Sequence, residues 1–238
     1  MATYPPQLVM TMPLHAITEM YGEVGLRQRF ALEIQKFDRA DRDVLEQALG
    51  LVSELHRLDR RSREPYVNHL LRTAIRIITY YDVTDVDVVA AALLHDSVED
   101  HPEELAAGRP GDPTEAALAE LAERFSPRVA DLVRAVTNPP RVPGLDRYQQ
   151  YREHVEESLS AHPWARVIKV SDFTDNGVGL MHSLPAKYQP LATKYRPLVP
   201  VLRELIARAD TPLSDPVKAH IRRQLDAAAE RFDAILGV

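Results

Sequence analysis

Residues 84–96, TDVDVVAAALLHD, constrain the fold more than any other stretch of the chain. The alanine run and the length of this stretch favour a helix over a strand, and apolar residues cover nearly every side of that helix. Such a helix must be buried on all sides, so other helices have to surround it. The stretch ends on His95 and Asp96, with Glu99 and Asp100 one turn further on. Charges at the end of a buried helix are costly unless a bound cation compensates them.

The rest of the chain predicts further helices and no convincing set of strands. Apolar residues at three-to-four spacing predict amphipathic helices over 42–57 and 66–81, the second with Pro65 in its first turn. Helix starts are predicted at Asp112-Pro113, Ser126-Pro127, His162-Pro163 and Pro216, because a capping residue or a proline stands before an apolar-periodic run. We therefore expect an all-α fold.

Composition limits the classes of function. A chain of 238 residues with 45% hydrophobic content can bury one substantial core. The net charge of −6 argues against binding to duplex nucleic acid, which needs an extended basic face. The absence of cysteine leaves His, Asp, Glu, Asn or water as ligands for any metal ion. The first residues lack a signal-peptide pattern, and the apolar run 88–94 is too short to cross a membrane, so we expect a cytoplasmic protein.

The spacing within HDSVED suits a metal-activated water. His95 and Glu99 are four residues apart, as are Asp96 and Asp100, so the second pair lies one helical turn beyond the first. A metal ion lowers the pKa of a bound water, and a nearby carboxylate can accept the proton. On an ideal helix adjacent residues diverge by about 100°, so His95 and Asp96 can share one ion only with ligands from other helices.

Two further stretches supply such ligands. RRSREPYVNHLLRTA, residues 60–74, places His69 on the inward face of the preceding helix. RVIKVSDFTDN, residues 166–176, has an apolar segment that leads to Asp172 and, four residues later on the same face, to Asn176.

With these residues the sequence resembles the HD-type hydrolase domain of the RelA/SpoT alarmone enzymes, and in size the stand-alone small alarmone hydrolases. That family carries a histidine on one helix, HDxxED on the next and KxADRLHN further on, and its RKSGEPYIVH is similar to RRSREPYVNH here. The resemblance covers residues 42–200. It implies that the metal ligands are His69, His95, Asp96 and Asp172 and that the catalytic acidic pair is Glu99 and Asp100. It also implies that Asn176 holds water and substrate.

The resemblance further implies the ion, the substrate and its contacts. The ion would be Mn²⁺, although iron, cobalt or zinc would also accept these ligands. The substrate would be guanosine tetra- or pentaphosphate, which loses its 3′-pyrophosphate. Arg60 occupies the position of the family's substrate-binding arginine. Arg61 occupies the position of the lysine that lies beside the nucleotide base, and Ser62 occupies the position next to that lysine. The expected partner is thus a small nucleotide, with no nucleic acid and no membrane, and the sequence makes no prediction of oligomeric state.

One stretch departs from the family and keeps alternatives open. Where the family reads DRLHNMRT, Phe173, Asp175 and Gly179 replace an arginine, a histidine and a threonine. The same metal centre could therefore act on an adenine alarmone, a nucleoside monophosphate or the 2′-phosphate of NADPH. The chain could also be a nucleotide-binding sensor without turnover, although the retained Glu99, Asp100 and Asn176 speak for an enzyme.

The domain boundaries expected from the sequence are an N-terminal extension with the first helix over 1–40, the HD phosphohydrolase domain over 41–210, and a C-terminal helix over 211–238 that packs on the same domain. The HD domain is expected to be a single helical bundle with the metal site between its central helices. Lys169 could approach a substrate phosphate, but we expect it to extend its chain along the core and to place its charged end in solvent. The remaining histidines are interpreted as structural or surface residues: His15, His56, His101, His154, His162, His182 and His220.

Overall fold

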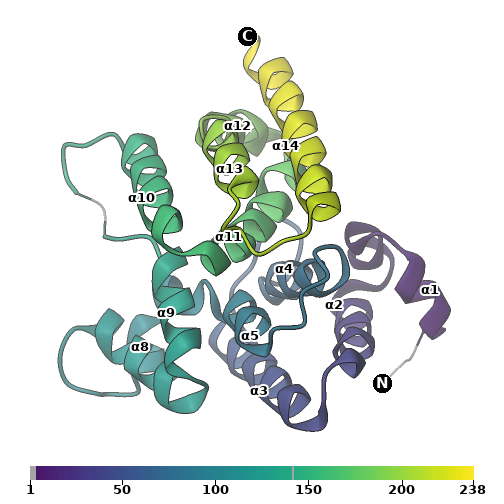
Figure 1. The fold of residues 1–238 in the computed structure, drawn as a ribbon, viewed down its shortest axis with the longest axis vertical. Helices are drawn as coiled ribbons and strands as arrows, with labels where there is room; N and C mark the ends of the chain where they lie inside the picture. The colour runs from purple at the N-terminus through teal and green to yellow at the C-terminus, as the bar shows by residue number, and fades with distance from the viewer. Residues whose placement is uncertain (1–3, 141) are drawn as a thin grey trace. The chain divides into compact units, whose positions relative to one another are not determined.

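The computed structural model describes residues 4–140 and 142–238. Over these ranges the protein is all-α, and β pairing is limited to an isolated bridge between Arg60 and Pro65 (Figure 1). The predicted fold class is thereby confirmed. Among the described helices, none is long and apolar enough to cross a membrane.

The α-helices over these ranges begin and end as follows: α1 Pro6–Thr11, α2 Leu14–Glu33, α3 Arg39–Leu55, α4 Val67–Thr79, α5 Val86–Leu94, α6 Ser97–Asp100, α7 Pro102–Ala106, α8 Pro113–Arg124, α9 Pro127–Val136, α10 Arg147–Ala161, α11 Pro163–Asn176, α12 Tyr188–Tyr195, α13 Leu198–Ala207 and α14 Asp215–Leu236. Short 3₁₀ turns lie at Ile34–Lys36 (η1), Val178–His182 (η2) and Pro185–Lys187 (η3).

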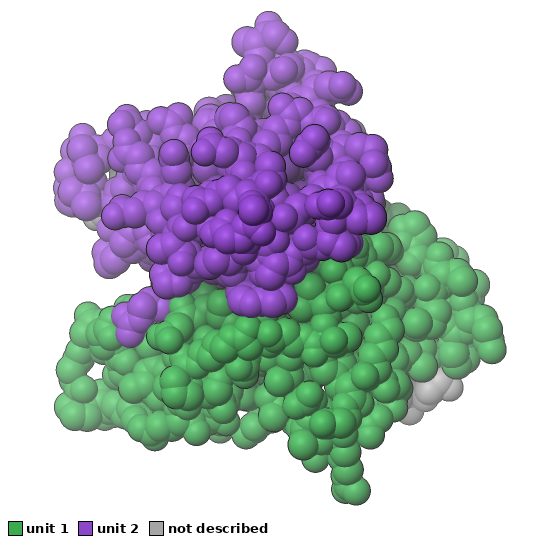
Figure 2. Space-filling view, in the orientation of Figure 1, with its two compact units in different colours: residues 1–133 green, residues 134–238 purple. Residues whose placement is uncertain are grey.

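The chain divides into two compact units, Met1–Val133 (unit 1) and Arg134–Val238 (unit 2), which Figure 2 distinguishes by colour. The division falls within the segment 41–210 that the sequence assigns to one domain. The predicted boundaries near residues 40 and 210 remain a prediction, and the two units are described separately below.

In unit 1, α5 is the central helix, as its all-round apolar character predicts. Every residue from Val88 to Leu94 is buried. The helices α3 and α4 pack on α5, and α2 packs on α4. Within α2 the chain kinks at Gly22, which has a φ of 59° that a residue with a side chain rarely adopts. The kinked α2 covers a face of α4, the helix that carries His69.

Several helices begin where the capping signals predict. The Asp112 carboxylate accepts a hydrogen bond from the Glu115 amide at 3.0 Å, and the Ser126 hydroxyl accepts one from the Val129 amide at 3.0 Å. The helix predicted over 42–57 begins earlier, at Arg39, because Asp38 caps it by accepting from the Asp41 amide at 2.9 Å.

Unit 2 is organised around α11, which contacts α10 and α13. The C-terminal helix α14 packs on α12 and α13. Pro216 lies in its first turn, as the sequence predicts. Residues 165–175 of α11 are buried, so this helix is the most enclosed of the unit.

Candidate metal centre and phosphohydrolase site

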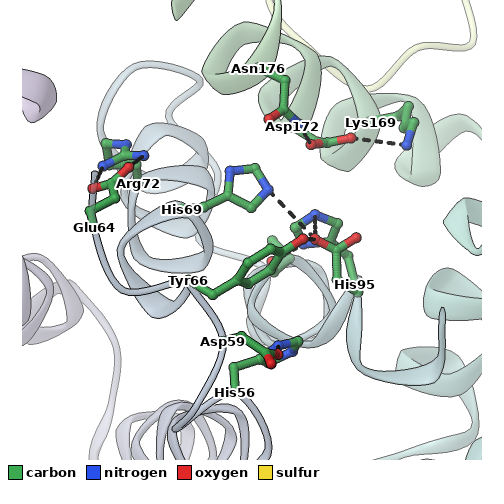
Figure 3. A network of polar contacts seen from close by, with 12 residues as sticks. His56, Asp59, Glu64, Tyr66, His69, Arg72, His95, Lys169, Asp172 and Asn176 are labelled. Carbon is green, nitrogen blue, oxygen red and sulfur yellow. Dashed lines mark hydrogen bonds and ion pairs between the residues drawn. The ribbon is translucent and has the colours of Figure 1, made fainter. Parts of the chain in front are cut away.

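Three predicted ligands come together in unit 1. His69 projects from α4, His95 caps the end of α5, and Asp96 follows it; Figure 3 shows the two histidine rings directed toward the same space. The Nε2 atom of His95 lies 3.1 Å from Oδ2 of Asp96, and Nε2 of His69 lies 3.6 Å from the same oxygen. Both histidine side chains are almost fully buried. The predicted pairing of His69 with the HD motif is thus present in the structure.

The geometry of the motif differs from the ideal helix that the sequence analysis assumed. The helix α5 ends at Leu94, and residues 95–96 form a turn before α6 begins at Ser97. The backbone keeps right-handed helical angles through this turn, with φ and ψ of −59° and −30° at His95 and of −96° and −7° at Asp96. The acidic pair therefore lies on a separate short helix and not on a continuation of α5.

Hydrogen bonds of the ligands prepare them for a cation. The Nδ1 atom of His95 lies 2.9 Å from the carbonyl oxygen of Ala92. A carbonyl can only accept, so Nδ1 carries the proton and the lone pair of Nε2 is directed at Asp96. The Tyr66 hydroxyl donates to Oδ2 of Asp96 at 2.7 Å. Burial and the charges of Asp96 and Asp100 raise the pKa of Tyr66, so it remains a donor.

The spacing of these atoms fits a transition metal. Ligand atoms about 2.0–2.2 Å from one ion lie roughly 2.8–3.6 Å from each other in octahedral or tetrahedral geometry, and the observed separations of 3.1 and 3.6 Å fall within that range. Imidazole nitrogen with carboxylate oxygen suits zinc, iron or manganese. The residues of unit 1 therefore supply an ordered set of side chains that could bind a metal ion.

The acidic pair lies immediately beyond this set. Glu99 and Asp100 lie on α6, and both side chains reach solvent. Loss of hydration around its carboxyl, together with the charges of Asp96 and Glu99, raises the pKa of Asp100 to about 6. A carboxyl with such a pKa can both accept and release a proton near neutral pH.

The predicted substrate residues Arg60, Arg61 and Ser62 lie on a loop between α3 and α4 that closes on itself. The Arg61 amide donates to the carbonyl of Glu64 at 2.8 Å, and the Tyr66 amide donates to the carbonyl of Asp59 at 3.1 Å. Arg60 is exposed on this loop. A pocket of about 320 Å³ is lined by Asp59, Arg60, Tyr66, Asp100 and His101. Arg60 and Asp100, predicted to act on the same substrate, thus face one pocket.

The remaining predicted residues, Asp172 and Asn176, lie on α11 of unit 2. The Asn176 amide donates to Oδ1 of Asp172, so the expectation that they share a helix face is confirmed. Oδ2 of Asp172 pairs with the Lys169 ammonium at 2.9 Å (Figure 3). Lys169 is 6% exposed, so its charged end is enclosed beside Asp172, whereas the sequence predicted that it would reach solvent. The Asp172 carboxylate is thus held between the Lys169 ammonium and the Asn176 amide.

The departures from the family motif also have structural explanations in unit 2. Phe173 is buried, and its ring meets those of Tyr195 and Phe232 edge-on, with centroids 5.6 and 6.4 Å away. It belongs to the core of the unit and cannot play the part of a polar substrate contact. Asp175 is only 4% exposed, so its carboxylate does not project freely into solvent.

One polar cluster was missed by the sequence analysis. His56 and His101, interpreted as structural or surface residues without partners, both contact the Asp59 carboxylate in unit 1. His101 is 42 residues from Asp59, so no local spacing signals this arrangement. The one signal in the sequence that could have indicated this cluster is the position of His101 directly after the acidic pair.

Comparison with known protein families identifies the segment that carries the HD motif. Residues 48–165 match the HD domain family. This segment is an HD domain. It contains His69, the HD pair and the acidic pair, whereas Asp172 and Asn176 lie beyond it.

The HD-domain protein is homologous to alarmone hydrolases. It is 34% identical over 130 residues to the guanosine-3′,5′-bis(diphosphate) 3′-pyrophosphohydrolase MESH1 of Mus musculus, a match that covers 53% of this chain and 63% of the relative. With the enzyme of that activity from Aquifex aeolicus it shares 27% identity over 157 residues, 65% of this chain and 20% of the relative. The chain thus spans less than two thirds of the length of these relatives.

A solved structure agrees with this relationship. A metazoan ortholog of SpoT, described as hydrolysing ppGpp, superposes with a TM-score of 0.55 at 26% identity, covering 79% of this chain and 97% of that one. The HD-domain protein therefore shares the fold of that hydrolase over most of its length.

Proposed function

We propose that the HD-domain protein is a metal-dependent phosphohydrolase that removes the 3′-pyrophosphate from guanosine tetra- or pentaphosphate. One observation carries the proposal: Nε2 of His69 and Nε2 of His95 both face one oxygen of Asp96, directly before an acidic pair. The activities named for the mouse and Aquifex aeolicus relatives support the choice of substrate.

The proposed cation is Mn²⁺, held by His69, His95, Asp96 and Asp172. In unit 1, the proton on Nδ1 of His95 and the hydrogen bond from Tyr66 to Asp96 support this assignment, because they orient the two ligands. In unit 2, Asp172 is held by Lys169 and Asn176, which fix the position of its carboxylate. The cation would supply Lewis acidity, which polarises a phosphate oxygen and lowers the pKa of water.

The reaction forms a bond from the water oxygen to the phosphorus on the ribose 3′-oxygen and breaks the bond between that phosphorus and the 3′-oxygen. The water loses a proton, and the 3′-oxygen gains one, so the products are GDP or GTP and pyrophosphate. Glu99 and Asp100 would orient the water and accept its proton, and the raised pKa of Asp100 suits that exchange. Asn176 would position the water.

The nucleotide would be held by the loop between α3 and α4. Arg60 lines the pocket that Asp100 also lines, so a phosphate bound there would lie near the acidic pair. A guanidinium forms paired hydrogen bonds with phosphate oxygens, which makes Arg60 and Arg61 suitable anchors, with Ser62 as a further donor. The partner is accordingly a small nucleotide.

A hydrolysis screen with Mn²⁺ tests the proposal, with Asp96→Ala as the inactive control. The substrates would be guanosine and adenosine alarmones, NADPH and nucleoside monophosphates, with pyrophosphate and orthophosphate measured separately. Pyrophosphate released from a guanosine alarmone by the wild type alone would support the proposal. Release of orthophosphate from NADPH or a monophosphate would indicate a hydrolytic metal centre that acts on a different substrate, consistent with the altered stretch 173–179. Nucleotide binding without any product would indicate a sensor.

A further inference from the structure

His101, which follows the acidic pair, forms a hydrogen-bonded chain with two residues of the α3–α4 region. Its Nε2 atom lies 2.6 Å from Oδ2 of Asp59, and Nδ1 of His56 lies 2.7 Å from the same oxygen. The His56 ring is buried and stacks on Tyr66, with centroids 4.8 Å apart. All three residues belong to unit 1.

The distances distinguish hydrogen bonding from metal binding at this cluster. Two ligands of one transition metal lie roughly 2.8–3.6 Å apart, a range that includes the separations of 3.1 and 3.6 Å around Asp96. Separations of 2.6 and 2.7 Å are those of charge-assisted hydrogen bonds. Asp59 therefore accepts a proton-bearing nitrogen from each ring, and Nε2 of His101 carries a hydrogen.

Because Nε2 of His101 is bonded to Asp59, a ligand would have to contact the other ring nitrogen, Nδ1. Nδ1 lies 3.7 Å from Oε2 of Glu104, which is too long for a hydrogen bond. His101 lines the pocket of about 320 Å³ together with Arg60 and Asp100. Its side chain is 16% exposed, so it is held in place but remains accessible to a molecule in the pocket.

We propose that His101 is a substrate-contacting residue: its imidazolium, held by Asp59 through Nε2, donates a hydrogen bond from Nδ1 to a phosphate oxygen of the bound nucleotide. The proposal rests on the proposed function, since it concerns the pyrophosphate group of that substrate. Asp59 is then a positioning residue that fixes the ring through Nε2. The bond would add to the contacts made by the guanidinium of Arg60.

Three carboxylates and one cation surround His101. The carboxylates are Asp59, Asp100 and Glu104, and the positive side chain is Arg60; Tyr66 and His56 complete the surroundings. Burial lowers the pKa of His56, against the effect of its hydrogen bond to Asp59. Hydrogen bonds from His101 and His56 hold the pKa of the Asp59 carboxyl below its usual range, against the effect of burial, so Asp59 is charged.

Calorimetric titration of the full chain with inorganic pyrophosphate in Mg²⁺ tests the inference. The variant His101→Gln keeps an amide that can reach Asp59 but offers no donor at the position of Nδ1, and His220→Gln is the matched control in unit 2. We expect the wild type and the control to bind pyrophosphate about tenfold more tightly than His101→Gln near pH 6, since a charge-assisted hydrogen bond is worth roughly that factor.

Two results would overturn the inference. One is equal pyrophosphate affinity of wild type and His101→Gln near pH 6. The other is a second equivalent of bound Zn²⁺ or Mn²⁺ that His101→Gln abolishes, which would make the cluster a second metal site. Because pyrophosphate binding is measured without turnover, the outcome is separate from the hydrolysis screen. A chain that cleaves no alarmone but binds pyrophosphate through His101 would refute the proposed function alone.

Discussion

Glu64 and Arg72 form a bidentate ion pair that joins the α3–α4 loop to α4. The two guanidinium nitrogens of Arg72 lie 2.7 Å from the two carboxylate oxygens of Glu64, and Arg72 is only 1% exposed (Figure 3). The Asn68 amide donates to the same carboxylate at 3.0 Å. Arg72 lies one helical turn after His69 on α4. The pair therefore fixes the loop that carries Arg60 and Arg61 to the helix that carries His69.

The substitution Glu64→Gln should loosen this loop without removing a metal ligand. We expect KM for the nucleotide to rise about tenfold, because Arg60 and Arg61 lose their fixed position. The free energy of unfolding should fall by about 1–3 kcal/mol, since the buried Arg72 loses its charged partner. Steady-state kinetics and urea denaturation measure the two effects. Bound Mn²⁺ should stay as in the wild type, and Glu54→Gln, an exposed carboxylate on α3, is the control.

The substitution Tyr66→Phe should weaken metal binding. It removes the hydroxyl that donates to Asp96 at 2.7 Å. Loss of a partner that orients a metal ligand typically costs 10- to 100-fold in metal affinity. We therefore expect a Kd for Mn²⁺ that is about tenfold higher. Titration with Mn²⁺ followed by electron paramagnetic resonance gives this Kd directly. Tyr80→Phe, at the exposed end of α4, should leave it unchanged. Equal affinities for both variants would mean that Asp96 needs no support from Tyr66.

Activity should fall on the acid side because of Asp100. Its pKa is raised to about 6 in the absence of a cation, so below that pH the carboxyl is protonated and cannot accept a proton from water. A bound cation offsets part of the Asp96 charge that raises this pKa, so the limb is expected at or below pH 6.

The pH dependence of kcat/KM tests this expectation. The residual activity of Asp100→Asn should lack the acid limb, whereas Glu103→Gln, an exposed carboxylate on α7, should keep it. An acid limb that persists in Asp100→Asn would assign the titration to another group.

Arg166 should be the most sensitive charged residue of unit 2. It is fully buried, and its guanidinium donates to the carbonyls of Leu159 and Ser160 and to both carboxylate oxygens of Asp210. Arg166→Met leaves these acceptors without their donor, and we expect a loss of about 3–5 kcal/mol in the free energy of unfolding. Arg208→Met is the control, since this exposed residue also pairs with Asp210 and should cost less than about 1 kcal/mol. Urea denaturation measures both values.

The ion pair between Arg166 and Asp210 also predicts a loss of folding stability at low pH. The hydrogen bonds from Arg166 hold the pKa of Asp210 at about 2, below its usual value. A carboxyl with a lowered pKa contributes stability above its unfolded pKa, and the contribution is lost as the pH falls toward 2. Asp210→Asn should therefore flatten the dependence of unfolding free energy on pH in that range, and an unchanged dependence would exclude this pair as its source.

The sequence predicted the elements whose signals are local. The helix α5 was predicted because its apolar residues leave no polar face, and the starts of α8 and α9 were predicted because Asp112 and Ser126 cap the first turn. His69 was paired with the HD motif because the resemblance joined two helices that contact in the fold.

What the sequence could not predict depends on tertiary structure. The break after Leu94 was missed because the pattern continues as though one helix ran through His95 and Asp96, whereas packing decides where it stops. The contact of His101 with Asp59 spans 42 residues and follows no periodicity. Phe173 could be assigned to the core only once Tyr195 and Phe232 were placed around it.

The closed loop between α3 and α4 has a consequence for how such a protein can diversify. Its shape is set by backbone hydrogen bonds and by Glu64, while Arg60 and Arg63 point their side chains outward from a frame that does not depend on them. Selection can therefore exchange these outward residues to suit a new nucleotide while His69, His95 and Asp96 stay as they are. Under the proposed function, the substrate specificity could therefore change through this loop alone, without any change in the proposed metal ligands.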